Sequence, residues 1–299
     1  MIKNVSVVGA GTMGNGIAHV FAQHGHIVTL IDISAAQLEK AIATIKKNLG
    51  RQFEKGTIGE VQIQETLDNI NTETDLARGV ATAHLVVEAA TENEAVKLKL
   101  FEQIDAAAPQ DCILATNTSS ISITKIASVT GRPQNLIGMH FMNPVPVMKL
   151  VEVISGYSTD SFVTGSIVEL SKKLGKVPAL AHDYPGFVAN RILMPMINEA
   201  INSLHEGVAD VEAIDTIMKL GMAHPMGPLQ LADFIGLDVC LSIMEVLFKG
   251  FGNPKYAPCS LLVNMVAAKK LGIKTGEGFY IYSHGTKDLI VSERFRKKG

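Results

Sequence analysis

The chain has 299 residues, of which 47% are apolar and 19% are charged, and its formal net charge is −2. A chain of this length and apolar content can bury a large core and suggests two domains. The small negative charge gives no general attraction to nucleic acid or to an anionic membrane, so neither is expected as a partner.

Cysteine usage and the amino-terminal sequence indicate where the protein works. Cys112, Cys240 and Cys259 stand far apart, without metal-like spacing, and are typical of reduced, buried thiols, so no metal is expected. The first apolar strand begins within a few residues of Met1, which predicts no leader. No apolar run approaches a membrane-spanning length. These features predict a soluble, cytoplasmic protein.

The first predicted strand, Ile2–Val8, runs into Gly9-x-Gly11-x-x-Gly14 and then into a helical pattern. In a dinucleotide-binding turn, the first glycine permits the tight turn and the second lets the backbone approach a pyrophosphate. The third permits close contact between helix and strand. The helix N-terminus offers unpaired N–H groups to the phosphates. The motif therefore predicts a bound dinucleotide.

The second predicted strand, Ile27–Ile31, ends in Asp32, where a ribose-binding carboxylate is expected. A carboxylate accepts hydrogen bonds from the ribose 2′-hydroxyl and repels a 2′-phosphate. No Lys or Arg stands between Lys3 and Lys40 to bind such a phosphate. The sequence therefore predicts NAD rather than NADP.

Further apolar runs follow along the first half of the chain, and helical patterns separate most of the early ones. This alternation predicts an α/β fold with a Rossmann-like, doubly wound, mostly parallel sheet. Strands are expected at Ile2–Val8, Ile27–Ile31, Leu85–Val87, Cys112–Ala115, Ile137–Phe141 and Met148–Ile154.

A charged segment with a helical pattern, from about Ala35 to Ile63, is longer than a normal crossover and is expected to form a helical arm. Lys47, Arg51 and Lys55 are four residues apart, so they share one helix face. Two interpretations remain open. The stripe is either a solvated face or a site for an anionic group of a large substrate.

A domain boundary is expected near Asp183–Gly186, where a proline–glycine pair interrupts the pattern. From Phe187 to about Leu271 the pattern is helical and rich in Ile, Leu and Met. We therefore expect an NAD-binding domain over 1–184 and an all-α substrate and dimerisation domain over 185–299. The many apolar helix faces favour burial against a second subunit, which predicts a homodimer.

Polar residues follow three predicted strands, at the sheet edge where open α/β sheets bind ligands. Ala115–Ser120 reads ATNTSS, which equally suits a turn or a helix cap. His140 closes an apolar strand before the proline-fixed turn Asn143–Pro146, which can fold the next strand, carrying Glu152, back beside it. We predict that His140 is a base and that Glu152 orients it, because a buried carboxylate requires a partner. The alternative is that Glu152 pairs with a surface lysine.

The chain resembles the L-3-hydroxyacyl-CoA dehydrogenase family, and within it most closely the single-function bacterial 3-hydroxybutyryl-CoA dehydrogenases. The resemblance runs nearly end to end in family order. Its motifs are GAGTMGNGIA (Gly9–Ala18), VVEAATEN (Val86–Asn93), ATNTSS (Ala115–Ser120), GMHFMNPVPVMKLVEVI (Gly138–Ile154), DYPGFVANRI (Asp183–Ile192), HPMGPLQLADFIGLD (His224–Asp238) and KTGEGFYIY (Lys274–Tyr282).

The resemblance implies reversible hydride transfer between NAD and C3 of an (S)-3-hydroxyacyl-CoA thioester, most closely 3-hydroxybutyryl-CoA. It implies that His140 is the general base, that Glu152 orients it, and that Ser119 and Asn190 position the substrate. Glu92 and Lys97 resemble residues that line the nicotinamide ribose. Cofactor contacts are expected at Gly9, Gly11, Thr12, Met13, Gly14, Asp32, Glu92, Lys97, Asn117 and Asn143. Since CoA carries phosphates, the resemblance also favours substrate binding by Lys47, Arg51 and Lys55.

Two other functions remain open. A free hydroxy-acid dehydrogenase of the L-gulonate type shares the NTSS, HFxNP and GFxxNR segments and would accept substrates without CoA. A non-catalytic nucleotide-binding or structural relative, of the lens-crystallin type, has little need of Ser119, His140, Glu152 and Asn190 together. A piece of a larger fatty-acid oxidation enzyme is disfavoured by the chain length.

Overall fold

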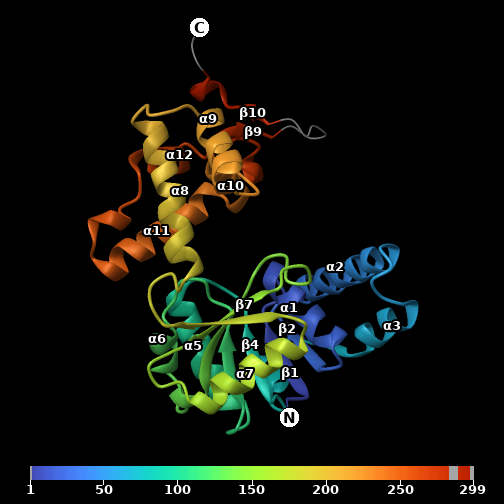
Figure 1. Ribbon diagram of the computed structural model, residues 1–299. Helices are drawn as coiled ribbons and strands as arrows, with labels where there is room; N and C mark the ends of the chain where they lie inside the picture. Colours follow the sequence, from blue (N-terminus) through green and yellow to red (C-terminus); the bar gives the residue numbers. More distant parts are fainter. Residues whose placement is uncertain (1, 283–288, 297–299) are drawn as a thin grey trace. The chain divides into compact units, whose positions relative to one another are not determined.

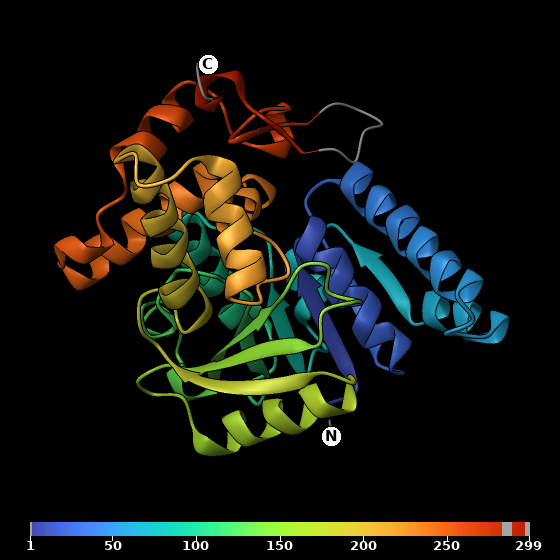
Figure 2. The same cartoon turned by 45° about the horizontal axis from the view of Figure 1, so that its top comes forward.

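The computed structural model describes residues 2–282 and 289–296 (Figures 1 and 2). The chain divides into two compact units between Tyr184 and Pro185. Each unit has a hydrophobic core of its own. No helix in the described ranges is long and apolar enough to cross a bilayer.

The first unit is built on an eight-stranded sheet with the order β3-β2-β1-β4-β5-β6-β7-β8. All neighbouring strands are parallel except β6 and β7, which pair antiparallel. This arrangement confirms the predicted Rossmann-like, mostly parallel fold. The strands are β1 (Asn4–Val8), β2 (Ile27–Ile31), β3 (Ile70–Glu73), β4 (Leu85–Glu88), β5 (Ile113–Thr116), β6 (Leu136–Phe141), β7 (Leu150–Ser155) and β8 (Val177–His182).

The sequence predicts neither β3 nor β8, which form the two edges of the sheet. Both centre residues of β3, Asn71 and Thr72, are exposed, and four of the six residues of β8 are exposed. Because an edge strand has less surface to bury than a central one, it lacks the continuous apolar run that marks the inner strands. The inner strands lie within two residues of their predicted bounds.

Seven α-helices and a short 3₁₀ turn, Pro133–Asn135, complete the described part of the first unit. α1 packs against α2 and α3 (Figure 1), and α5 packs against α4 and α6. The helices are α1 (Thr12–Gln23), α2 (Ala35–Glu54), α3 (Glu60–Asp68), α4 (Leu76–Val80), α5 (Glu94–Ala107), α6 (Ile123–Ala127) and α7 (Ser161–Lys173).

The predicted helical arm is a pair of helices, α2 and α3. Ser34 caps α2 by accepting a hydrogen bond from the Gln37 N–H (3.3 Å). Gly56 has a positive φ of 67°, and the chain turns there before α3 begins. One face of α2, including Ile45 and Leu49, is buried in the core of the unit. The arm is therefore packed along one side, and its charged residues lie on the other.

The second unit is helical, as predicted, apart from a short antiparallel pair that the sequence does not predict, β9 (Tyr280–Ile281) and β10 (Ile290–Val291). A π-helical turn spans Ile217–Gly221, and 3₁₀ turns span Pro254–Tyr256, Ile273–Thr275 and Glu293–Phe295. The α-helices are α8 (Ala189–His205), α9 (Val211–Thr216), α10 (Pro228–Ile235), α11 (Leu237–Phe251) and α12 (Ser260–Ala267).

Two buried carboxylates attach the segment after α12 to the helices of the second unit. Asp233 of α10 accepts hydrogen bonds from the N–H groups of Phe279 and Tyr280 and from the Tyr282 hydroxyl (3.1, 3.0 and 3.0 Å). A Cβ on Gly278 would overlap this carboxylate. Glycine at that position therefore lets the chain approach Asp233 closely.

Asp215 of α9 accepts hydrogen bonds from the Leu229 and Gln230 N–H groups (2.9 and 3.0 Å) and from the Tyr280 hydroxyl (2.8 Å). Burial raises the pKa of Asp233 to about 6, and the nearby Asp215 charge adds to this shift. Burial also raises the pKa of Asp215. The ionised forms of both carboxyls are therefore disfavoured, although their hydrogen bonds oppose the shift.

We expect the folded state to be stabilised as the pH falls from about 6 to about 4. The folded-state pKa of Asp233 lies above the ordinary value of 3.8 for this side chain, so the folded state binds this proton more tightly than the unfolded state does. The stabilisation is complete below the unfolded pKa, is lost as the pH rises through the folded pKa, and amounts to about 3 kcal/mol. Urea unfolding followed by circular dichroism measures it. Asp233→Asn should flatten this dependence, while Asp238→Asn should not; an unchanged slope in Asp233→Asn would contradict the assignment.

Candidate active site

The glycine turn between β1 and α1 lies where the strand order of the sheet reverses, between β1 and β4. Gly9 has a φ of +100°, and a Cβ there would lie 2.6 Å from the Ala90 Cα, in the turn after β4. A Cβ on Gly14 would overlap the Gly9 carbonyl oxygen. These two glycines are therefore required by the fold itself. Such a switch point is where open α/β sheets bind their ligands.

Gly11 differs from these two glycines. Its φ is −68°, and a Cβ at this position would meet nothing within 4 Å. Neither backbone strain nor protein packing therefore explains a glycine here. A close ligand would explain it, because a side chain would stand between the backbone and a pyrophosphate.

Helix α1 begins at Thr12. Its N-cap residue, Gly11, has no side chain to accept a hydrogen bond from the first turn, and that turn, which includes Met13, contains no acidic residue. Its N–H groups are thus available to an anion, as a dinucleotide phosphate requires. A cavity of about 270 Å³ adjoins this helix end, and Gly11, Thr12, Lys40 and Asn143 are among the residues that line it. The donors and the space fit a pyrophosphate.

Asp32 follows β2 and holds the glycine turn in place. Its Oδ2 accepts from the Ala10 N–H (2.9 Å), and its Oδ1 accepts from the Ser34 N–H (3.0 Å). Gln37 supports the same turn by donating to the Ala10 carbonyl (3.0 Å), a contact that the sequence does not predict. Each carboxylate oxygen has a second lone pair, so Asp32 retains acceptor capacity for a ribose hydroxyl.

Three polar side chains meet at the ends of β5, β6 and β7. The antiparallel register sets His140 directly opposite Glu152, so the predicted pairing of these two strands is present. His140 Nδ1 lies 2.8 Å from Glu152 Oε2, and His140 Nε2 lies 3.1 Å from Ser119 Oγ. The histidine is 7% exposed and the glutamate 3%. The pair is thus buried, while the half-buried Ser119 lies at its outer end.

The Glu152 carboxylate fixes which nitrogen of His140 carries the proton. An ionised carboxylate only accepts hydrogen bonds, so Nδ1 donates to Glu152 and Nε2 of the neutral ring is the acceptor. Nε2 is then the atom that can take a proton from a hydroxyl group, and the carboxylate stabilises the imidazolium that results. The arrangement is that of a base and its orienting group.

Glu92 connects the β4 and β5 ends of the site. Its carboxylate accepts from the Thr118 hydroxyl (3.0 Å to either oxygen) and from the Ser119 N–H (2.6 Å). Lys97 is 1% exposed and forms an ion pair with Glu88. The sequence does not predict Glu88 as a site residue. A carboxylate that ends an apolar strand is the signal that could have found it.

The remaining predicted site residues belong to both units. Asn117 is buried, and its Oδ1 accepts from the Phe141 N–H (2.9 Å), which ties β5 to β6. Lys47 and Arg51 are exposed on α2, and Lys55 is the exposed residue that follows the helix. Asn190 belongs to the second unit, in the first turn of α8.

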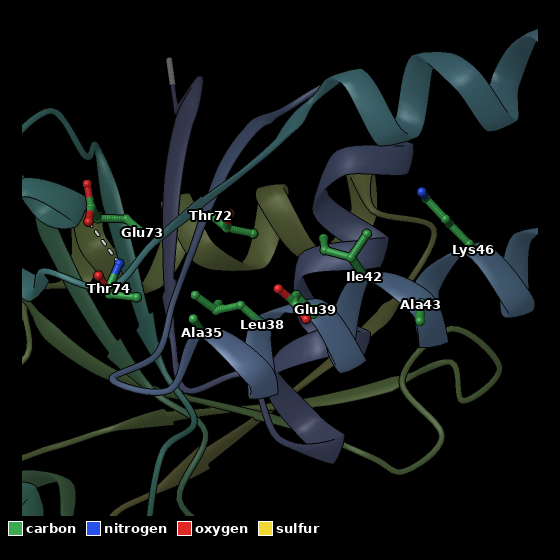
Figure 3. A pocket seen from close by; sticks show the side chains of 9 residues that line it. All are labelled: Ala35, Leu38, Glu39, Ile42, Ala43, Lys46, Thr72, Glu73 and Thr74. Atoms are coloured by element: carbon green, nitrogen blue, oxygen red, sulfur yellow. Dashed lines mark hydrogen bonds between the residues drawn. The ribbon is translucent and has the colours of Figure 1, made fainter.

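A second cavity, of about 480 Å³, lies between α2 and β3 (Figure 3). Leu38 and Ile42 of α2 contribute apolar surface, and Glu39, Lys46 and Glu73 contribute charges. None of the predicted catalytic or cofactor residues lines it. This cavity lies at the carboxyl end of the edge strand β3, whereas Ser119 follows β5, and His140 and Glu152 belong to β6 and β7, farther across the sheet.

The cysteines take no part in the site. All three are buried and unpaired, and burial raises the pKa of Cys112 and of Cys240 to about 12. Such thiols are protonated at neutral pH and are poor nucleophiles. Within the residues that the structure describes, no cluster of His, Cys, Asp and Glu could hold a metal ion.

Two family models match nearly the whole chain. The NAD binding domain of 3-hydroxyacyl-CoA dehydrogenase matches residues 4–184, and the C-terminal domain of 3-hydroxyacyl-CoA dehydrogenase matches residues 186–282. The predicted family and the predicted cofactor, NAD, are thereby confirmed.

Relatives of known name agree with the family models. The chain is 51% identical to a probable 3-hydroxybutyryl-CoA dehydrogenase from Bacillus subtilis, over 95% of this chain and 99% of the relative. It is 53% identical to a 3-hydroxybutyryl-CoA dehydrogenase from Bradyrhizobium diazoefficiens, over 94% and 96%. The solved (S)-3-hydroxybutyryl-CoA dehydrogenase from Ralstonia eutropha superposes with a TM-score of 0.92 at 50% identity, over 95% and 100%. The chain thus belongs to the 3-hydroxyacyl-CoA dehydrogenase family of NAD-dependent oxidoreductases.

Proposed function

We propose that this chain interconverts (S)-3-hydroxybutyryl-CoA and acetoacetyl-CoA at the Ser119–His140–Glu152 cluster. The observation that carries the proposal is the alignment of Glu152, His140 and Ser119 through two hydrogen bonds, of 2.8 and 3.1 Å. The names of relatives at about 50% identity support the short-chain CoA substrate. NAD, when bound, accepts the hydride from C3 of the hydroxyacyl group and returns it in the reverse direction.

In the oxidation direction, His140 Nε2 takes the proton of the 3-hydroxyl group as the carbonyl forms. Glu152 holds the ring and stabilises its positive charge. Ser119 and Asn190 donate hydrogen bonds to the 3-oxygen, where negative charge develops in the reduction direction. In that direction the imidazolium returns its proton to the oxygen. His140 therefore serves as the base in one direction and as the acid in the other.

The cofactor is held by the glycine turn, with the pyrophosphate at the α1 N-terminus and the adenosine ribose at Asp32. Glu92 and Asn143 contact the nicotinamide end, and Lys97 and Asn117 support them from the interior. The support for this placement is Gly11, whose lack of a side chain neither strain nor packing explains.

Measuring turnover on several substrates tests this function most simply. The protein is expected to consume NADH fast with acetoacetyl-CoA. It should consume NADPH slowly with the same substrate, and NADH slowly with free acetoacetate. Oxidation of a free sugar acid should also be slow. Activity restricted to the free acids would assign the chain to the L-gulonate type. Inactivity on every substrate would favour the non-catalytic role.

The CoA phosphates are assigned to the basic stripe of Lys47, Arg51 and Lys55. Lys40, which lines the cavity beside the glycine turn, stands seven residues before Lys47 and so lies on the same helix face. The stripe therefore continues from the proposed cofactor site along α2. A solvated face of unrelated charges needs no such continuity.

Replacing Lys47, Arg51 and Lys55 together with glutamine should raise KM for acetoacetyl-CoA about tenfold and leave kcat unchanged. Each exposed ion pair contributes about 0.2–1 kcal/mol, and salt weakens it. Steady-state kinetics at low ionic strength measure the effect. Lys46→Gln is the control, since Lys46 is exposed on α2 but lines the other cavity. An unchanged KM would indicate that the stripe is a solvated face and does not bind the substrate.

Assembly and location are part of the same proposal. The second unit exposes many large apolar side chains on its helices, which supports a homodimer that buries some of them. Light scattering should then give twice the chain mass of 32.0 kDa. Examples of the exposed apolar side chains are Val188, Ile192, Ile217, Leu220, Met222, Phe248 and Val263.

The three unpaired cysteines support a reducing compartment, the cytoplasm.

A further inference from the structure

Glu88 is a fully buried charged side chain near the proposed reaction centre. It ends β4 with no exposed surface. Its Oε1 accepts from the N–H groups of Ala90 (2.9 Å) and Thr91 (3.4 Å). Its Oε2 accepts from the Thr116 hydroxyl (2.8 Å) and from Lys97 Nζ. Four donors from three segments thus converge on one buried carboxylate.

These contacts connect Glu88 to both functional parts of the first unit. Ala90, which Glu88 holds, lies against Gly9 of the cofactor turn. Thr116 ends β5, and its Oγ1 accepts from the Thr118 N–H (3.2 Å) at the start of the segment that carries Ser119. The carboxylate therefore joins the turn after β4 to the turn after β5.

Lys97 extends the connection toward the base. Its Nζ is buried between Glu88 and Glu92 and lies 3.6 Å from Glu92 Oε2. Glu92 in turn accepts from the Ser119 N–H, and Ser119 Oγ contacts His140 Nε2. A continuous chain of ion pairs and hydrogen bonds thus runs from Glu88 to the proposed base, all within one unit.

We propose that Glu88 is a positioning residue for the reaction centre: by holding Lys97 beside Glu92, it fixes the turn that sets Ser119 Oγ against His140. The inference rests on the proposed function, because it takes Ser119 and His140 as the reaction centre. Glu88 itself touches neither substrate nor cofactor. Its effect on turnover passes through Lys97 and Glu92.

Glutamine cannot replace Glu88 in this role. One oxygen and one NH₂ group cannot accept from Lys97, Thr116 and the N–H groups of Ala90 and Thr91 together. The NH₂ group would face donors, and Lys97 would be a buried cation without its counter-charge. We expect Glu88→Gln to lower kcat about 10²-fold at saturating NADH, because a displacement of about 1 Å of a reacting group has that effect.

The double variant Glu88→Gln/Lys97→Met separates positioning from general stability. Replacing both members of a buried ion pair with neutral residues often restores or raises stability. We expect the melting temperature to recover in the double variant while kcat stays about 10²-fold below wild type. Recovery of kcat together with the melting temperature would overturn the inference, because it would show a purely structural role.

Asp105→Asn is the matched control. Asp105 pairs with the buried Arg132 (2.6 Å to Nε) and accepts from the Gly131 N–H (2.7 Å), in the same unit but outside the connection described above. This variant should lower the melting temperature and leave kcat of the folded protein unchanged. An equal loss of kcat in Asp105→Asn would also overturn the inference.

A spectroscopic measurement distinguishes failure of this inference from failure of the proposed function. The ¹⁵N resonance of His140 Nε2 reports its hydrogen bond with Ser119, whether or not the protein turns over. The double variant should shift this resonance, and Asp105→Asn should leave it in place. An unshifted resonance in the double variant would overturn the positioning role, whereas an inactive wild-type protein would overturn only the proposed function.

Discussion

Replacing His140 with glutamine is expected to lower kcat by about 10²–10⁴, the usual contribution of a general base. Glutamine is close in size and can still bond to Glu152, but it cannot take a proton from the 3-hydroxyl group. The loss corresponds to about 2.7–5.5 kcal/mol of transition-state stabilisation. NADH affinity should be nearly unchanged, because the proposed cofactor contacts lie on other residues.

Stopped-flow measurement of the reduction of acetoacetyl-CoA gives the rate of the chemical step, and NADH fluorescence gives the cofactor affinity. His24→Gln is the control, since His24 is exposed near the other end of α1. It should keep the wild-type rate. An unaltered kcat in His140→Gln would remove this residue from the mechanism.

The substitutions Gly11→Ala and Gly14→Ala are expected to impair different properties: the first the affinity for NADH, the second the stability of the fold. Gly14→Ala sets a Cβ on the Gly9 carbonyl oxygen, so the turn must shift and the protein should lose about 1–3 kcal/mol of stability. Gly11→Ala meets no protein atom within 4 Å and has an ordinary φ, so the fold should tolerate it. Its Cβ instead meets the pyrophosphate, and NADH affinity should fall about 10-fold or more, in line with an overpacking cost of about 1–3 kcal/mol.

Thermal unfolding without cofactor and NADH titration followed by fluorescence separate the two effects. Gly14→Ala should melt at a lower temperature, and Gly11→Ala should melt like the wild type while binding NADH weakly. Wild-type affinity in Gly11→Ala would contradict the placement of the dinucleotide at this turn.

The features that could be predicted from the sequence are those with strong local signals. The glycine turn needs glycine at Gly9 and Gly14 for reasons of backbone and packing, and these reasons are visible in the residue types and their spacing. The partnership of His140 and Glu152 follows from a proline turn between two apolar strands and from the cost of an unpaired buried carboxylate. Both inferences use sequence neighbours only.

Other features depend on contacts between different strands, helices and turns of the fold. The resemblance predicts Lys97 beside a ribose, but it does not predict the ion pair that Glu88, at the end of β4, forms with this buried lysine. The role of Gln37 depends on how α2 lies against the glycine turn. The edge strand β8 pairs with β7 through a crossover, although few of its residues are buried. No local pattern encodes these contacts, because tertiary packing determines them.

The central claim is hydride transfer between NADH and C3 of an acyl-CoA thioester. The most direct test reduces acetoacetyl-CoA with NADH deuterated at the transferred position and analyses the product by mass spectrometry and chiral separation. The account predicts (S)-3-hydroxybutyryl-CoA with a single deuterium at C3, formed by the wild type and only very slowly by His140→Gln. A product without deuterium at C3, or no product from the wild type, would contradict it.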